Sequence, residues 1–385
     1  MGVRRVNKLN ELVHKYCPNG VEYKKVKDVF RRLRGTAITA SRMKEIESLD
    51  GEIRVFAGGK TVINAKEKDI PNANIIRVPA VLVQSRGVID VVYYEEPFTF
   101  KNEMWAYTAD DKIAVKFLYY VLKNNIQRFR DAAAGMGSLP QISLPVTEEF
   151  EIPVPPLPVQ SEIVRILDNF TELTAELTAE LTARKKQYGY YRDFLYTVDD
   201  ADVEWTTLDR ISENCDRQRK PVTKGNRVAG KYPYYGASGI VDYVEDYIFD
   251  GDFLLVSEDG ANLLARSTPI AFSISGKNWV NNHAHVLKFD AYELRRYVEI
   301  YLNSIDLSKY ISGGAQPKLN QENLNKIPIP VPSPERVKYV VSILDRFDTL
   351  CHDISAGLPA EIKARQKQYE YYRDKLLIFK DVSKC

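Results

Sequence analysis

Two long stretches of the chain carry apolar residues at helical spacing. In the first, apolar residues recur three, four or seven positions apart from Ile163 to Leu195, and in the second they do so from Val340 to Leu376. This spacing places them on one stripe of an amphipathic helix. The Pro-rich segments PVPPLP and PIPVPSP come just before and cannot lie inside a helix, so each helix should begin after its leader. The pattern predicts two helices of roughly 35 to 40 residues.

A stripe of this length needs a partner, and the nearest helix with the same pattern is the other copy. Packed together, the two helices would hold the flanking regions at a fixed distance. The tetrapeptide TAEL occurs at Thr174–Leu177 and again at Thr178–Leu181, and it indicates a helical spacer because Ala, Glu and Leu favour helices. Gly357 and Pro359 interrupt the second pattern, which predicts a break there.

The rest of the chain has the pattern of strands with a few short helices. Ile75–Tyr94 alternates and is dense in Ile and Val, and Tyr232–Val244 and Phe249–Val256 are aromatic and β-branched segments separated by Gly and Asp. Helices are expected at Ile113–Phe129 and Tyr292–Leu302. The predicted fold class is therefore α+β.

An internal repeat organises these elements. Residues 152–173 match residues 329–350 at ten of 22 positions, and residues 183–195 match residues 364–376 at ten of 13. Upstream, VEYKKVKDV at Val21 resembles VEWTTLDRI at Val203, and the Gly-rich loops at Gly135 and Gly313 set Pro140 opposite Pro317. The predicted order is a variable region, a helix, a second variable region and a second helix, with boundaries at 1–156, 157–198, 199–332 and 333–385.

Composition excludes several classes of protein. The chain has 385 residues, 44% hydrophobic and 28% charged, which does not fit a disordered, collagen-like or disulfide-rich protein. No apolar run reaches the roughly 18 residues of a membrane helix, and the first 20 residues lack the apolar core of a signal peptide. We therefore expect a cytoplasmic protein with no membrane partner. The four cysteines have no Cys-x-x-Cys spacing, and neither a metal nor a cofactor is predicted.

The net charge of +2 hides two local basic stretches. Residues 1–34 contain ten Lys or Arg against three acidic residues, and residues 210–231 contain seven against two. Each stretch includes or follows one copy of the VEYKKVKDV-like segment. Because the stretches occupy equivalent places in the repeat, the sequence favours two phosphate-binding surfaces over ordinary solvated charge.

No catalytic motif is apparent. AGGKT at Ala57 resembles the end of a phosphate-binding loop, but Arg54 stands where the leading glycine should be. His283 and His285 lie two apart and would need distant ligands to hold a metal, so strand alternation is the simpler interpretation.

The order of these features resembles one family. Two divergent regions alternate with two similar helices, each with an IPxP leader, an ILDxF start and a YYRD-containing end, and KYPYYGASGIVDYV lies inside the second region. Together with the TAEL repeats, they resemble the specificity subunit of type I restriction-modification enzymes across nearly the whole chain. The resemblance implies two pseudo-symmetric target-recognition domains separated by two long antiparallel coiled-coil helices.

The resemblance also implies function and partners. Each domain would read one half of a bipartite site in double-stranded DNA, and the helices would set the gap between the halves. The helices would dock two methyltransferase subunits and, through these, the motor-nuclease subunits, while the chain itself would not be catalytic. Two alternatives from other classes stay open at this stage: a coiled-coil scaffold with protein-binding ends, and a fused enzyme with unrecognised catalysis.

Candidate contact residues follow from residue type and position. For phosphates and bases we expect donors and small polar residues on Gly-containing loops and basic segments. In the first region these are Arg31, Arg32, Arg34, Lys60, Thr61, Gln84, Ser85 and Arg86. In the second they are Arg217, Arg219, Lys220, Lys224, Arg227, Ser238, Ser257, Lys277 and Asn278, with Glu258 beside them. Tyr and Arg are frequent at protein interfaces, so the candidates for partner binding are Tyr190, Arg192, Tyr371 and Arg373.

Overall fold

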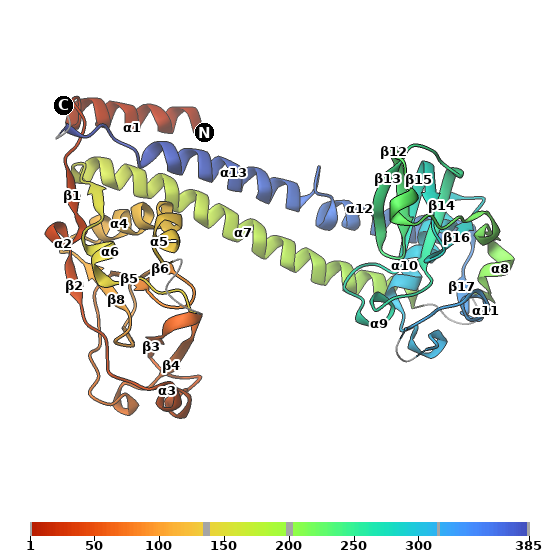
Figure 1. Ribbon diagram of the computed structural model, residues 1–385, viewed down its shortest axis with the longest axis horizontal. Coiled ribbons are helices and arrows are strands. Elements are labelled where there is room, and N and C mark those ends of the chain that lie inside the picture. Colours follow the sequence, from red (N-terminus) through yellow and green to blue (C-terminus); the bar gives the residue numbers. More distant parts are fainter. Residues whose placement is uncertain (1, 134–138, 198–202, 314–315, 383–385) are drawn as a thin grey trace. The chain divides into compact units, whose positions relative to one another are not determined.

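The structure is a computed structural model that describes residues 2–133, 139–197, 203–313 and 316–382 (Figure 1). It divides into two compact units. Unit 1 comprises residues 1–178 and 362–385, and unit 2 comprises residues 179–361. The expected linker 199–202 and the glycine at position 135 lie outside the described residues. None of the described helices is both long enough and apolar enough to cross a membrane.

The sheet of unit 1 is built around a buried strand. All five residues of β5 are buried, which explains its apolar sequence AVLVQ. A four-stranded sheet has the order β2 (Arg31–Leu33), β8 (Trp105–Thr108), β5 (Ala80–Gln84) and β6 (Asp90–Tyr94). Beside it, a three-stranded sheet has the order β4 (Val62–Ala65), β3 (Ile53–Phe56) and β7 (Phe98–Phe100), in which β3 and β7 are parallel.

Unit 2 repeats this arrangement in one sheet. Its six strands have the order β11 (Glu213–Asn214), β16 (Ala284–Lys288), β14 (Phe249–Ser257), β15 (Ala271–Val280), β12 (Ala229–Gly236) and β13 (Gly239–Val244). As β3 does in unit 1, β12 pairs with the strand that follows it in an antiparallel manner and with a later strand in a parallel manner. Thus β15 takes the places of both β6 and β7, and the two units share one topology.

Short elements complete each unit. Unit 1 also contains α1 (Gly2–Tyr16), β1 (Tyr23–Lys25), α2 (Val26–Val29), α3 (Ala40–Ile46), α4 (Lys112–Asn124), α5 (Ile126–Ala133), α6 (Leu144–Glu148) and β9 (Glu151–Pro153). Unit 2 also contains β10 (Glu204–Thr206), α8 (Leu208–Ile211), α9 (Asn262–Ala265), α10 (Tyr292–Ser304), α11 (Gln321–Asn325) and β17 (Ile329–Val331). The pairs β1–β9 and β10–β17 are both antiparallel, so this part of the topology is repeated as well.

The predicted long helices are present, with the break where it was expected. The first is α7 (Leu157–Tyr196), a continuous helix of 40 residues, and the second is divided into α12 (Pro334–His352) and α13 (Leu358–Leu376). Asp353 forms the turn between α12 and α13 by accepting a hydrogen bond from Ser355 N at 2.7 Å. A Cβ atom at Gly357 would lie 2.3 Å from the carbonyl oxygen of Thr349, so only glycine fits this tight approach.

Within each unit, part of α7 packs against the second helical region through matched aromatic pairs. In unit 1, Phe170 stacks on Tyr372 with ring centroids 5.5 Å apart, and in unit 2, Phe347 lies 5.5 Å from Tyr191. The roles are exchanged between the two helical regions. Each phenylalanine lies two residues after an ILD sequence, and each tyrosine is the second tyrosine of a YYRD sequence. Tyr188 also contacts His352. The lower-numbered tyrosine of α7 thus contacts the higher-numbered residue of α12, so α12 runs antiparallel to this part of α7.

The two ends of the described chain meet inside unit 1. Val21 N donates to the carbonyl oxygen of Lys380 at 2.9 Å, and Val382 N donates to that of Val21 at 3.1 Å. The α1 helix lies near the start of α7 (Figure 1). Lys8 Nζ of α1 lies 3.4 Å from Glu162 Oε2 of α7. Unit 1 is thus built from sequence-distant segments, whereas unit 2 is a single contiguous stretch.

Candidate nucleic-acid interface

A glycine-containing turn follows the central strand of each sheet. In unit 1 the turn contains Ser85, Arg86 and Gly87 after β5, and Gly87 N donates to the carbonyl oxygen of Pro140 at 2.8 Å. The next bond in this pairing runs from Ile142 N to the carbonyl oxygen of Ser85 at 2.9 Å. The turn is therefore fixed by two backbone hydrogen bonds to the proline segment.

Unit 2 contains the same construction. The turn after β14 contains Glu258, Asp259 and Gly260, and Gly260 N donates to the carbonyl oxygen of Pro317 at 3.1 Å. Leu319 N donates to the carbonyl oxygen of Glu258 at 2.7 Å. Both glycines have positive φ, +78° and +103°, a backbone region that glycine adopts without steric cost. The match of Pro140 with Pro317 in the sequence thus corresponds to a match in three dimensions.

In each unit, the loop of a β-hairpin is hydrogen-bonded to this turn or to the strand residue just before it. In unit 1 the loop between β3 and β4 approaches it, and Gly59 N donates to the carbonyl oxygen of Arg86 at 3.3 Å. In unit 2 the loop between β12 and β13 does so, and Ser257 Oγ donates to the carbonyl oxygen of Ala237 at 2.5 Å. The candidate loops around residues 58–61 and 84–87, and those around 236–239 and 257–260, are therefore brought together within their own units.

The structure buries four of the candidate residues. Gln84, Ser85, Ser257 and Asn278 have at most 4% of their surface exposed, so these side chains do not reach a groove edge in this conformation. Ser85 Oγ donates to the carbonyl oxygen of Glu103, and Asn278 Nδ2 donates to that of Gly276 at 2.8 Å. The hydrogen bonds of Ser85, Ser257 and Asn278 fix the backbone around them.

Other candidates lie at the surface. The exposed ones are Arg31, Arg34, Thr61, Arg86, Arg217, Lys220, Lys224, Ser238 and Lys277. Lys60 lies at the end of the loop turn Gly58–Lys60, and its side chain is outside the described atoms. Lys277 Nζ lies 4.5 Å from the ring centre of Tyr247, which orients this ammonium group through a cation–π contact.

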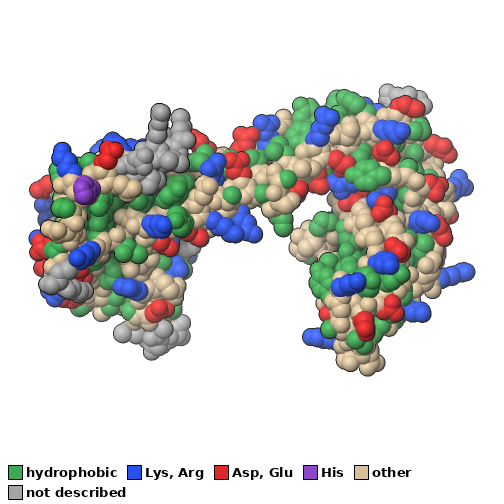
Figure 2. Space-filling view, turned by 90° about the horizontal axis from the view of Figure 1, so that it is seen from above, with side chains coloured by type: hydrophobic (Ala, Val, Ile, Leu, Met, Phe, Trp, Pro, Cys, Tyr) green, Lys and Arg blue, Asp and Glu red, His purple; other side chains and the backbone are tan. Residues whose placement is uncertain are grey.

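Three of the basic candidates are engaged in ion pairs. Arg32 lies 3.2 Å from Glu148, Arg227 lies 3.1 Å from Asp242, and Arg219 lies 2.6 Å from Glu258. Arg227 also covers the ring of Tyr234 at 4.3 Å. On the face shown in Figure 2, Lys and Arg side chains are interspersed with acidic ones. Phosphate contact would therefore depend on the exposed members of each cluster.

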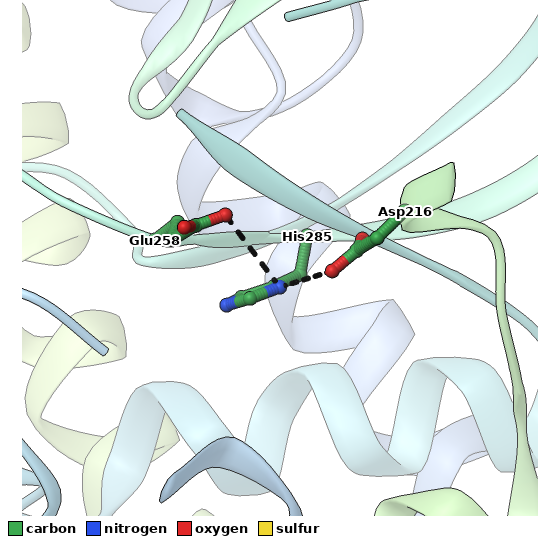
Figure 3. A group of neighbouring side chains, drawn as sticks. All are labelled: Asp216, Glu258 and His285. Atoms are coloured by element: carbon green, nitrogen blue, oxygen red, sulfur yellow. Dashed lines mark hydrogen bonds and ion pairs between the residues drawn. The ribbon is translucent and has the colours of Figure 1, made fainter. Parts of the chain in front are cut away.

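Asp216, Glu258 and His285 form a mostly buried cluster (Figure 3), and Arg219 pairs with both acids. His285 is 1% exposed, and its Nδ1 lies 2.6 Å from Asp216 Oδ2. Burial opposes ionisation of both acids, but hydrogen bonds and charge attraction from His285 and Arg219 hold the pKa of Asp216 and that of Glu258 below their ordinary values. The cluster anchors the turn after β14, because Glu258 is part of that turn.

Asp216, Glu258 and His285 have the residue types of a metal site, but their bonding does not suit one. Nε2 of His285 lies 2.7 Å from the carbonyl oxygen of Leu319, which can only accept, so this nitrogen carries a proton. Nδ1 faces the Asp216 carboxylate, and the Glu258 oxygens lie 2.6 Å from Arg219 and 3.1 Å from Lys318. A cation would have to displace a proton and two positive side chains. The cluster is thus an ion-pair network. Strand alternation, the sequence-based interpretation of the two histidines, accounts for the burial of His285 on β16 but not for its contacts with Asp216 and Leu319.

The equivalent position of unit 1 holds a neutral arrangement. Opposite Val83 on β5 lies Trp105, as His285 lies opposite Val256 on β14. Trp105 Nε1 donates to Thr147 Oγ1 at 2.8 Å, and Thr147 also bonds the Tyr107 hydroxyl at 2.7 Å. The same place in the sheet is therefore filled by aromatic rings in one unit and by charges in the other.

A second matched feature is a polar joint, by which we mean the aspartate of an ILD sequence and its partners on the helix that covers the sheet, α4 in unit 1 and α10 in unit 2. In unit 1, Asp168 of α7 lies 2.8 Å from Lys116 Nζ and accepts a hydrogen bond from the Tyr120 hydroxyl at 2.5 Å. Asp168 is the acid of the first ILD sequence, and a groove of about 610 Å³ lies beside it. The sequence identified this acid only as part of the repeat.

In unit 2, Asp345 of the second ILD sequence has the same function. Arg296 Nε donates to Asp345 at 2.7 Å, and the Tyr292 hydroxyl donates to it at 2.6 Å. Arg296 also pairs with Asp348 and Glu299, and these carboxylates raise its pKa despite its burial. A groove of about 560 Å³ lies beside this joint. The two joints are chemically alike, but the second is more deeply buried and carries more charge.

The candidates for partner binding lie on the YYRD segments of α7 and α13. Tyr190 and Tyr371 are 67% and 54% exposed. Each lies edge-on to the next tyrosine in its helix. Arg192 and Arg373 pair with the aspartates that follow them, at 2.7 and 2.8 Å. These side chains leave aromatic surface accessible on both YYRD segments.

Asp259 and His283 were not among the predicted contact residues. Asp259 stands on the turn of unit 2 at the place that Arg86 occupies in unit 1, and His283 Nδ1 lies 2.8 Å from its carboxylate. The isolated bridges Arg86–Gln141 and Asp259–Lys318 establish this equivalence. The match of VQSRG with VSEDG could have revealed it from the sequence.

Comparison with known proteins gives a consistent result. The family model described as type I restriction modification DNA specificity domain matches twice, at residues 18–184 and 202–364. A putative type I restriction enzyme specificity subunit of Haemophilus influenzae is 37% identical over 198 residues, which cover 50% of this chain and 51% of the relative. The chain thus matches about half the length of that relative.

Two further similarities cover more of the chain. The EcoR124I/EcoR124II specificity subunit of Escherichia coli is 35% identical over 295 residues, which cover 70% of this chain and 72% of the relative. The S subunit of a type I restriction-modification system from M. genitalium has the same fold, with a TM-score of 0.66 at 18% identity over 94% of this chain and 97% of that one. The chain therefore belongs to the family of type I restriction-modification DNA specificity proteins.

Proposed function

We propose that this chain is the DNA-specificity subunit of a type I restriction-modification complex. The observation that carries the proposal is the repeated turn: each unit presents a glycine-containing turn held by its own proline segment and joined by a hairpin loop. Two copies of the same turn and loop arrangement suit a DNA target that is divided into two halves. The two matches of the DNA specificity domain and the functions for which the relatives are named support this interpretation over a protein-binding scaffold.

In this proposal the four parts of the chain have distinct tasks. Residues 1–156 and 199–332 are the target-recognition domains, and residues 157–198 and 333–385 are the helical spacer. Basic side chains such as Arg31 and Lys220 bind phosphates without regard to sequence, and the loops read bases in the groove.

The chain acts through partners and is not itself catalytic. Two methyltransferase subunits dock on the helical regions, with Tyr190 and Arg192 on one copy and Tyr371 and Arg373 on the other, and motor-nuclease subunits join through them. Exposed tyrosines on repeated segments suit two identical partners, because each partner needs the same surface.

The test uses the full chain assembled with its methyltransferase subunits. Modified-base profiling of DNA exposed to the complex should give two short sequence elements separated by an unspecified gap. One continuous sequence element would contradict the proposal that each domain reads its own half-site. DNA binding that is insensitive to salt would favour the scaffold alternative.

Deleting one TAEL tetrapeptide, residues 178–181, tests the spacer. The deletion removes about 6 Å of helix, so we expect the gap to shorten while both sequence elements stay the same. A four-residue deletion also rotates the remainder of the helix by about 40°, so replacing TAEL by four alanines is the matched control, which should leave the gap unchanged. Altered half-site sequences would show that the helix does not act as a spacer.

A further inference from the structure

The matched turns of the two units present opposite hydrogen-bonding chemistry. In unit 1 the outward residue is Arg86, whose side chain is exposed and forms no ion pair or hydrogen bond with any other described side chain. In unit 2 the equivalent residue is Asp259, whose carboxylate is 32% exposed. A guanidinium group can only donate, whereas an ionised carboxylate can only accept.

Both residues stand on rigid supports. The residue before each is buried: Ser85 bonds to the Glu103 carbonyl group, and Glu258 is held by Arg219. The glycine after each donates to a proline carbonyl group. The backbone of each residue is therefore fixed, which sets the point from which its side chain extends and favours discrimination between bases.

The acid on the unit 2 turn is informative because it opposes general DNA affinity. A carboxylate near the phosphate backbone is repelled, so Asp259 does not serve phosphate binding. His283 Nδ1, 2.8 Å from Asp259, orients the carboxylate but leaves acceptor positions unused, since each oxygen has two lone pairs. A carboxylate can, however, accept a hydrogen bond from the exocyclic amino group of a base in the major groove.

We propose that Arg86 and Asp259 are specificity-determining residues of opposite polarity. Arg86 reads a guanine through N7 and O6 in one half-site. Asp259 reads a base that presents an exocyclic amino group, cytosine N4 or adenine N6, in the other half-site. This inference rests on the proposed function and adds the class of base that each half must contain.

The experiment measures base preference at every position of both half-sites for the full chain with its methyltransferase subunits. Arg86→Ala should lower the preference for guanine about 5- to 150-fold at one position and leave the other half-site unchanged. Arg86→Gln should shift that position toward adenine, because glutamine pairs with adenine N6 and N7. This gain of a new preference cannot result from misfolding.

In unit 2, Asp259→Ala should relax one position of the other half-site. The base preferred by the unaltered protein at that position, cytosine or adenine, identifies which amino group is read. Two exposed charges away from the turns serve as matched controls: Arg77→Ala in unit 1 and Asp246→Ala in unit 2 should change affinity without altering any base preference.

The outcomes separate this inference from the proposed function. If the unaltered complex recognises two half-sites and the variants at Arg86 and Asp259 keep both sequences intact, the assignment of these residues is wrong and the proposed function stands. If the unaltered complex recognises no divided sequence, the proposed function fails. A change that spreads over both half-sites in either variant would also overturn the assignment.

Discussion

Units 1 and 2 share one strand order but stabilise it with different chemistry. At the sheet position opposite the central strand, unit 1 places Trp105 in a neutral hydrogen bond to Thr147, whereas unit 2 places His285 among charged side chains. At the joint to the long helix, unit 1 uses Lys116, whose side chain is 30% exposed, and unit 2 uses Arg296, which is 15% exposed.

One backbone topology thus accommodates different hydrogen-bond and ion-pair partners at the same polar positions. Aromatic packing and ion clusters fill the same place in the sheet. They differ in what happens when one member is removed, because an ion left alone in a buried site costs far more than a lost neutral bond. Unit 2 should therefore be the more sensitive unit to single polar substitutions.

The largest contrast between the two units is expected at the polar joints formed by Arg296 in unit 2 and Lys116 in unit 1. Arg296→Met leaves Glu299 without its counter-ion in a buried site, so we expect a loss of about 3–5 kcal/mol in the unfolding free energy of unit 2. The matched variant Lys116→Met breaks a partly exposed pair, and its cost should stay below about 1 kcal/mol. Hydrogen exchange of α10 and α4 amides measures each unit separately. Equal losses would show that exposure does not separate the two joints.

A smaller contrast is expected inside the sheets. His285→Ala removes the hydrogen bonds to the Asp216 carboxylate and to the Leu319 carbonyl group but leaves Asp216 and Glu258 paired with Arg219, so the expected cost is about 2–3 kcal/mol. Trp105→Phe keeps one aromatic ring at this position and leaves Thr147 bonded to Tyr107, so the loss of one neutral hydrogen bond should cost about 1 kcal/mol. Denaturant unfolding combined with exchange of the β14 and β8 amides compares them. A costlier Trp105→Phe would contradict the expectation that the ionic position is the more sensitive one.

The smallest expected effect is a change in how the stability of unit 2 depends on pH in the acid range. Asp216 and Glu258 have pKa values held below their ordinary 3.8 and 4.5, so the stability they contribute is present above those values and is lost as the pH falls through the lowered ones. Burial raises the pKa of Glu299, which acts in the opposite direction. We expect Asp216→Asn to flatten the acid limb of unit 2 unfolding, measured by denaturation from pH 5 downward. An unchanged limb would mean that other carboxylates control it.

Much of the fold could be predicted because its signals are local. Periodicity identified the long helices, and Gly357 marked the break. The repeat aligned Pro140 with Pro317, whose carbonyl groups accept equivalent hydrogen bonds in the two units. Predicting Ile113–Phe129 as one helix missed the division at Asn125 into α4 and α5, because the apolar period continues across it.

The candidate site could be predicted only at the level of loops. Ser257 and Asn278 looked accessible beside their glycines, yet the structure buries them, since the register at a strand end decides which way a polar side chain points. The ion cluster joins residues 216 and 219 to residues 258 and 285, and no local pattern links positions so far apart. Asp168 and Asp345 were visible as identical letters of the repeat, but their partners on α4 and α10 come from the tertiary packing.

The composition of unit 1 from both ends of the chain has a consequence for biosynthesis. Unit 2 is contiguous, so all of its residues have emerged from the ribosome once position 361 has cleared the exit tunnel. Unit 1 must wait for residues 362–382, because Leu377 belongs to its core and Lys380 accepts the hydrogen bond from Val21. Although translation usually lets N-terminal domains fold first, here the amino-terminal half is the last to be completed.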